Sequence, residues 1–154
     1  MDVRIINSFL AAAIHVIKTM ARIEAKPGKP FLKKDDSALG DVSAVINITG
    51  ALHGCMILSF DESCIKAIVS NLFGEAVTDI NNEVKDAVGE LTNVICGDAR
   101  RRIALEKIAL EAGIPSIVSG TNHSVTHSHH GPLIAIPFTT PSGRFAVEIS
   151  LRGP

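Results

Sequence analysis

Hydrophobic residues near the start of the chain recur with the spacing of a helix. They form one apolar stripe with a second row beside it: Ile5, Phe9, Ala12, Val16 and Met20, then Ile6, Leu10, Ile14 and Ile17. A face this broad is typical of a helix that packs on two sides or takes part in an interface. His15 and Lys18 interrupt the apolar run, which is also too short to span a bilayer, so we interpret it as neither a signal peptide nor a membrane anchor.

Strand patterns occupy two later stretches of the chain. In the first, Val42–Thr49 alternates and Cys55–Phe60 is a continuous apolar run, so the two are expected to form a hairpin. In the second, Phe145–Leu151 alternates cleanly. Weaker patterns predict three more strands, at 31–34, 116–119 and 133–138. Pro137 lies inside the last of these, which predicts an edge strand or a bulge there.

Two further helices are predicted between these stretches. The shorter one follows Asp61, a good N-cap, and stops at Gly74. The longer one begins at Asn81 or Asn82 and extends as far as Leu110. It has an apolar stripe at helical spacing, formed by Val84, Ala87, Val88, Leu91 and Ile95.

The order of elements suggests one unit, a helix plus three strands, that is used twice. Short turns between the strands imply mainly antiparallel pairing, and helices on one face of such a sheet make an α+β layer. We therefore predict a single domain over residues 1–154, with a mainly antiparallel six-stranded sheet and two long helices on one face.

Composition narrows the classes of function. The 154 residues are 46% hydrophobic and 20% charged, with a net charge of −1, which is typical of a globular protein with no general attraction to nucleic acid or anionic lipid. Six Phe and no Tyr or Trp argue against a base-stacking surface. Cys55, Cys64 and Cys96 stand apart, without a C-x-x-C pair, so we expect buried thiols in a cytoplasmic protein.

Four residues of the long helix lie nearly opposite its apolar stripe. Asp86, Glu90, Asn93 and Gly97 are spaced i, i+4, i+7 and i+11, so they stack along one ridge, which we call the α-helical ridge. The ridge carries two acids, an amide and a residue without a side chain, so a partner could approach closely at Gly97. The bare pattern is also typical of a helix face that is merely solvated.

The context of the ridge resembles a known signature. Asp86-x-x-x-Glu90-x-x-Asn93, within Glu-Leu-Thr-Asn-Val-Ile-Cys-Gly-Asp-Ala-Arg, is similar to that of the CheC/CheX/FliY phosphatases of bacterial chemotaxis. Pro115 is the natural match to a proline downstream in that signature. CheC-type members carry the Glu/Asn pair on two helices, whereas the first helix here has Asn7 without a partner Glu, so the pattern is closest to the CheX branch.

The resemblance implies hydrolysis of the acyl phosphate on an aspartate of a receiver domain such as CheY. Asn93 would position the attacking water, because a carboxamide both donates and accepts hydrogen bonds. Glu90 would engage a cation of the receiver, by family analogy its active-site lysine. Any Mg²⁺ would belong to the receiver, since the ridge offers too few oxygens to hold one, and the protein itself needs no cofactor. Asp86 would be an auxiliary partner contact or a solvated residue, and a homodimer is expected.

Two other clusters have alternative interpretations. His123, His127, His129 and His130 could bind a transition metal, but nearby Cys, Asp and Glu are lacking, so we favour a polar hairpin and predict no metal site. The run from Arg100 to Arg102 is interpreted as a solvated face, with docking of an acidic receiver as the alternative. The competing function for the whole chain is a non-catalytic module that docks a receiver or a flagellar or signalling partner.

Overall fold

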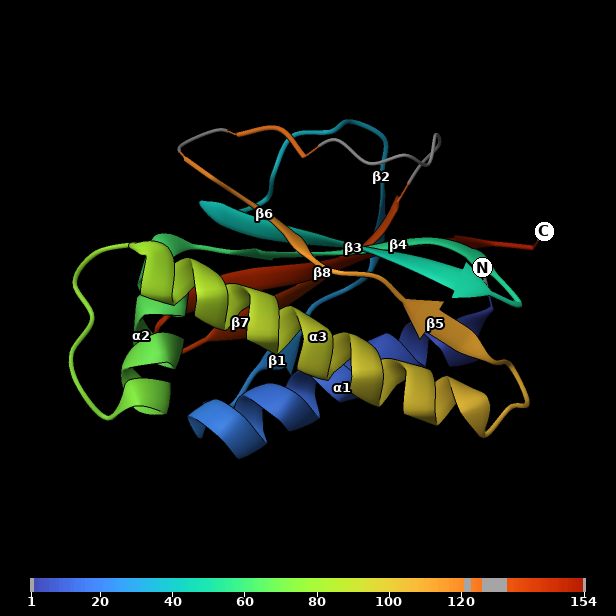
Figure 1. The fold of residues 1–154 in the computed structure, drawn as a ribbon, viewed down its shortest axis with the longest axis horizontal. Coiled ribbons are helices and arrows are strands. Elements are labelled where there is room, and N and C mark those ends of the chain that lie inside the picture. The colour runs from blue at the N-terminus through green and yellow to red at the C-terminus, as the bar shows by residue number, and fades with distance from the viewer. Residues whose placement is uncertain (1, 121–122, 126–132, 154) are drawn as a thin grey trace.

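Helices cover one face of an eight-stranded sheet in the computed structural model, which describes residues 2–120, 123–125 and 133–153 (Figure 1). The three helices are α1 (Val3–Ala21), α2 (Glu62–Phe73) and α3 (Asn82–Ala104). The strands are β1 (Lys26–Pro27), β2 (Phe31–Lys33), β3 (Val42–Gly50), β4 (His53–Phe60), β5 (Leu110–Ala112), β6 (Ser116–Ser119), β7 (Leu133–Thr140) and β8 (Gly143–Arg152).

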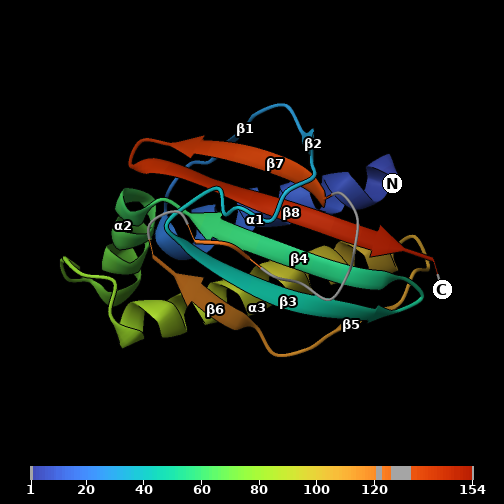
Figure 2. The same ribbon diagram turned by 90° about the horizontal axis from the view of Figure 1, so that it is seen from above.

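The sheet has the order β1-β7-β8-β4-β3-β5, with β2 also pairing with β7 and β6 with β3 (Figure 2). All of these pairings are antiparallel, which confirms the predicted α+β class with two long helices on one face. The sheet has two more strands than predicted, β1 and β5. The sequence does not reveal them because they are only two and three residues long, too short to show a period.

The long helix α3 ends at Ala104 and does not reach Leu110. After it, Lys107 adopts a left-handed backbone conformation with φ of 62°, which turns the chain back toward the sheet. Leu110 then begins β5 at the edge of β3. The prediction of a helix through Leu110 was therefore wrong, because apolar residues continue at helical spacing past the point where the backbone turns.

The core lies between the helices and the sheet. Ile46, Met56 and Ile149 are register partners across β3, β4 and β8, and all three are buried beneath the helices. On the other face, a smaller cluster of Cys55, Ile57, Val125 and Leu133 is covered by the segments around β2 and residues 123–125. The three cysteines are free and buried, as predicted, and burial raises the pKa of the Cys55 thiol to about 12.

Helix α1 uses its broad apolar face within the chain. It packs on α3, α2 and β8, with Phe9, Ala12 and Ile17 fully buried. Packing on several sides is therefore confirmed. An interface on this face stays a prediction, since Ile6, Leu10 and Ile14 of the second row are only half-buried. The apolar run was expected to be too short to span a bilayer, but α1 is longer than that run and is, by length and composition, the one described helix that could cross a membrane. A third of its most apolar 18-residue window is buried against the rest of the chain.

Strand β7 contains Pro137 without being the edge strand itself. β1 pairs with Thr139 and Phe138, and β2 pairs with 133–135, so the added strands are interrupted opposite the proline. At the interruption the amide of Gly28 donates to the Pro137 carbonyl over 2.7 Å. Pro137 has no N–H with which to donate a hydrogen bond back to Gly28. This explains why two short strands, β1 and β2, pair with β7 in place of one continuous strand.

Candidate active site

Helix α3 is held rigidly under the sheet by its buried side. Asn81 caps it, its side chain accepting from the Val84 amide over 3.0 Å, and Glu83 lies in the first turn, where an acid favours the helix dipole. The apolar stripe is buried along its whole length and continues past Ile95 to the last turn of the helix: Val84, Ala87, Val88, Leu91, Ile95, Ala99 and Ile103. Residues opposite this stripe are therefore presented on a fixed backbone.

The α-helical ridge faces away from the core, as its spacing predicts. Asp86, Glu90 and Asn93 are exposed, and Gly97 is half-buried. None of the three polar side chains makes a hydrogen bond or an ion pair with any other described part of the chain. An acid and an amide one turn apart are thus both available to a partner.

The basic run after the ridge is engaged within the chain and is not simply a solvated face. Arg101 and Arg102 pair with the carboxylate of Asp98, which is only 5% exposed; the Arg102 contact measures 2.9 Å. Arg100 Nη1 donates to the Leu110 carbonyl over 3.3 Å and so ties α3 to β5. Sequence reasoning missed Asp98, although an acid followed at i+3 and i+4 by arginines is a recognisable signal.

Pro115 lies immediately before β6, the strand that runs beside α3. A Cβ placed on Gly89 of α3 would lie 3.8 Å from Ile117 Cδ1 of β6, so helix and strand are in close contact there. The downstream proline of the signature is therefore brought to the same side of the molecule as the ridge.

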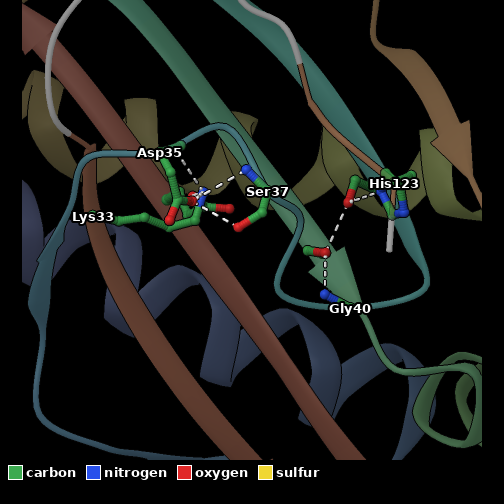
Figure 3. A network of polar contacts seen from close by, with 8 residues as sticks. Lys33, Asp35, Ser37, Gly40 and His123 are labelled. Carbon is green, nitrogen blue, oxygen red and sulfur yellow. Dashed lines mark hydrogen bonds and ion pairs between the residues drawn. The ribbon is translucent and has the colours of Figure 1, made fainter. Parts of the chain in front are cut away.

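The histidine cluster is described only at His123, because His127, His129 and His130 lie outside the described residues. His123 does not face the ridge; its Nε2 lies 2.7 Å from Ser43 Oγ on the opposite face of the sheet (Figure 3). Ser43 Oγ is also hydrogen-bonded to Ser59 Oγ over 2.7 Å, and Ser59 Oγ accepts from the Gly40 amide over 2.9 Å. Since the Gly120 carbonyl can only accept, His123 Nδ1 donates to it. No group of three metal-binding side chains occurs among the described residues.

A buried ion pair on the same face was also missed from the sequence. Lys33 Nζ lies 2.9 Å from Glu148 Oε1, and both side chains are almost fully buried. Lys33 also donates to the Asp35 carbonyl over 3.1 Å (Figure 3). The Glu148 oxygens have no well-aligned donor among the described residues, and burial raises the pKa of this carboxyl, partly opposed by Lys33. This ion pair is remote from the ridge, and it helps to hold the segment around β2 over this face of the sheet.

An antiparallel sheet with two long helices on one face, the second of which exposes an uncommitted Glu/Asn pair, is the CheC-like class of protein. A CheC-like superfamily protein from Shewanella sp. PV-4 has the same fold, with a TM-score of 0.92 and 40% identity over 99% of this chain and 100% of that chain. The family model for the chemotaxis phosphatase CheX matches residues 42–139, so the chain belongs to the CheX family.

Two other similar proteins are a CheY-P phosphatase and a CheX in complex with CheY. The CheY-P phosphatase CheX of Thermotoga maritima is 28% identical over 156 residues, covering 99% of this chain and 98% of that protein. The CheX of the CheX–CheY–BeF3–Mg²⁺ complex from Borrelia burgdorferi is 25% identical, with a TM-score of 0.80, over 96% of this chain and 97% of that chain.

Proposed function

We propose that this protein hydrolyses the aspartyl phosphate of a response-regulator receiver domain such as CheY. Membership of the CheX family, the CheY-P phosphatase of Thermotoga maritima and the CheX–CheY complex of Borrelia burgdorferi support this substrate class. The observation that carries the proposal is the pair of exposed, uncommitted side chains, Glu90 and Asn93, on a helix whose other side is fully buried.

Asn93 is the residue that positions water. Its carboxamide oxygen accepts a hydrogen bond from the water and its NH₂ group donates one to the water oxygen, so one water is held in line with the phosphorus. The water oxygen bonds to phosphorus while the bond to the aspartyl carboxylate oxygen breaks, which releases inorganic phosphate and the free aspartate. An acyl phosphate has a good leaving group, so positioning is sufficient and no strong base is needed.

Glu90 lies one turn before Asn93 and engages a cation of the receiver, by family analogy its active-site lysine. This contact fixes the docked orientation and contributes to affinity. Mg²⁺ belongs to the receiver in this scheme, because Asp86 and Glu90 alone cannot supply the six oxygens that the ion prefers. Asp86 is an auxiliary contact, and Gly97 allows the receiver backbone to approach the ridge.

The protein acts in the cytoplasm, as a homodimer in which each chain is one domain over residues 1–154. The sheet supports dimer formation, because the outer sides of its edge strands present backbone groups with which a second copy could pair: β1 and β2 at one edge, β5 and β6 at the other. The alternative function, a module that docks a receiver without catalysis, uses the same ridge. The retained Asn93 favours the phosphatase, since docking alone needs no water-positioning amide.

The test compares substitutions at the two residues. Asn93→Ala should lower turnover on the order of 10²-fold, about 2.7 kcal/mol, and leave receiver binding nearly intact. Asn93→Asp should be at least as damaging, because it places a negative charge before the phosphoryl oxygens. Glu90→Ala should instead weaken binding, since it leaves the receiver's cation unpaired.

Dephosphorylation of the cognate receiver is measured at several enzyme concentrations, with binding to the beryllofluoride-loaded receiver followed in parallel. All three variants should fold normally, because both residues lie opposite the buried stripe. Near wild-type turnover in the Asn93→Ala protein would refute the phosphatase mechanism and favour the docking module.

A further inference from the structure

The edge of the sheet beside α3 contains a bulge. β5 pairs Ala112 with Ile48, and β6 pairs Ser116 with Val45, both against β3. Residues 113–115 therefore stand opposite residues 46–47, which is three residues against two. An extra residue in one strand bends it and re-aims its side chains. The Gly113 amide still donates to the Asn47 carbonyl over 3.0 Å, and Pro115 has no N–H with which to restore the pairing.

The bulge lies alongside the middle of α3. At one end of the segment, the Leu110 carbonyl accepts from Arg100; at the other, Ile117 lies against Gly89. The strands thus run opposite to the helix, and the segment that joins β5 to β6 lies along α3 (Figure 1). Residues 113–115 come between the two contacts, so they are placed beside the turns of α3 between Gly89 and Arg100, which carry Asn93 and Gly97. At about 100° per residue, Gly89 and Arg100 both lie on Asn93's side of Glu90, so the bulge flanks the ridge on that side.

Two exposed aliphatic side chains border the ridge. Ile114, within the bulge, is 92% exposed, the highest value among the large hydrophobic residues that the structure describes. Val94, 37% exposed, projects about 40° from Glu90 on the side away from Asn93. The polar pair is therefore flanked by an aliphatic group on each side, an arrangement suited to a protein partner and not to a small ion.

We propose that Ile114, with Val94, is a specificity-determining contact for the receiver, and this rests on the proposed function. The surface fits a partner face with a cation for Glu90 and apolar side chains around it. Burying the two aliphatic groups contributes affinity, and it excludes bulk water from the rim of the Glu90–Asn93 pair. Pro115 acts indirectly, by keeping the chain bulged so that Ile114 faces outward.

The test uses a matched pair of exposed residues. Ile114→Ser should weaken binding of the beryllofluoride-loaded cognate receiver about tenfold, or about 1.4 kcal/mol, and raise KM in proportion. Its kcat should stay within about twofold, because no group that touches the reacting atoms is removed. Leu105→Ser is the control. Leu105 is 84% exposed but lies about 18 Å from Asn93 along the helix direction, so its replacement should change neither Kd nor KM. Ile114→Val should retain binding within about twofold, since most of the apolar group remains.

Binding and turnover separate the possible failures. If the wild-type protein binds the receiver without dephosphorylating it, the phosphatase function fails, but the comparison of Ile114→Ser with Leu105→Ser in binding still decides the role of Ile114. Equal effects of these two substitutions, or no effect of Ile114→Ser, would overturn the inference. Absence of any receiver binding by the wild-type protein would overturn both proposals.

Discussion

The glycine of the α-helical ridge offers a substitution whose effects on stability and on activity should have opposite signs. A Cβ placed on Gly97 would meet no closer atom than Arg100 Nη2, at 4.0 Å, the end of a flexible side chain. The fold therefore accommodates Gly97→Ala without rearrangement. Glycine in a helix interior is less favourable than alanine by about 0.5–1 kcal/mol, so the variant should be more stable. For a chain of this size that gain corresponds to roughly 1–4 °C in Tm.

The same methyl group should hinder the receiver. If the partner's backbone approaches the ridge at Gly97, an added methyl acts as an overpacking change at the interface, which costs about 1–3 kcal/mol. The Kd and KM for the receiver should accordingly rise by roughly 5- to 150-fold, while the protein melts at a higher temperature. Stability is followed by thermal unfolding, and activity by loss of phosphate from the cognate receiver.

Gly89 provides the matched control in the same helix. A Cβ there would touch Ile117 Cδ1 at 3.8 Å, an ordinary van der Waals contact, on the side of the helix that faces β6. Gly89→Ala should show a similar gain in Tm with unchanged activity. A Gly97→Ala protein with wild-type affinity and KM would show that the ridge is not approached closely at this point, and Gly97 would then lose its assigned role.

Three further predictions concern parts of the chain outside the ridge. Lys33→Met should destabilise the fold by about 3–5 kcal/mol, because it leaves Glu148 buried and unpaired. Burial raises the pKa of Glu148 in the folded state, so the unfolded chain releases this proton first as pH rises, and the stability of the fold falls between the two pKa values. The loss of stability in Lys33→Met should therefore be larger at pH 7 than at pH 5. The double substitution Lys33→Met/Glu148→Leu should recover most of that stability, and thermal unfolding measures each change. Replacing His127, His129 and His130 together with Ala should leave phosphatase activity nearly unchanged with or without a chelator, whereas a large loss would revive the metal-site hypothesis. Light scattering at micromolar concentration should give the mass of a homodimer, and a monomeric mass would contradict that prediction.

Local patterns in the sequence were sufficient for the elements that place the ridge. The stripe from Val84 to Ile95 has a clear helical period, and its burial leaves the opposite side, with Glu90 and Asn93, exposed. The strands β3, β4 and β8 alternate or run apolar over enough residues to be recognised. Short elements such as β1 and β5 were missed, because two or three residues show no period and form only where a longer strand offers an unpaired edge.

Features that depend on register could not be predicted from the sequence. The bulge at 113–115 exists because Ala112 and Ser116 pair with positions of β3 that are one residue too close together, and no local pattern near Pro115 encodes that offset. The same holds for Lys33 and Glu148, whose pairing brings together residues 115 positions apart.

The bulge also connects the stability of the fold to the proposed recognition of the receiver. The extra residue prevents regular pairing of residues 113–115 with β3, which leaves Ile114 without packing inside the chain and 92% exposed. An isolated folded chain gains little from an aliphatic side chain in water, so Ile114 contributes little to the stability of the fold. Since the bulge lies beside the turns of α3 that carry Asn93 and Gly97, a receiver docked on the ridge is the partner placed to cover it. Selection for binding, more than for folding, would then explain why an isoleucine occupies this position.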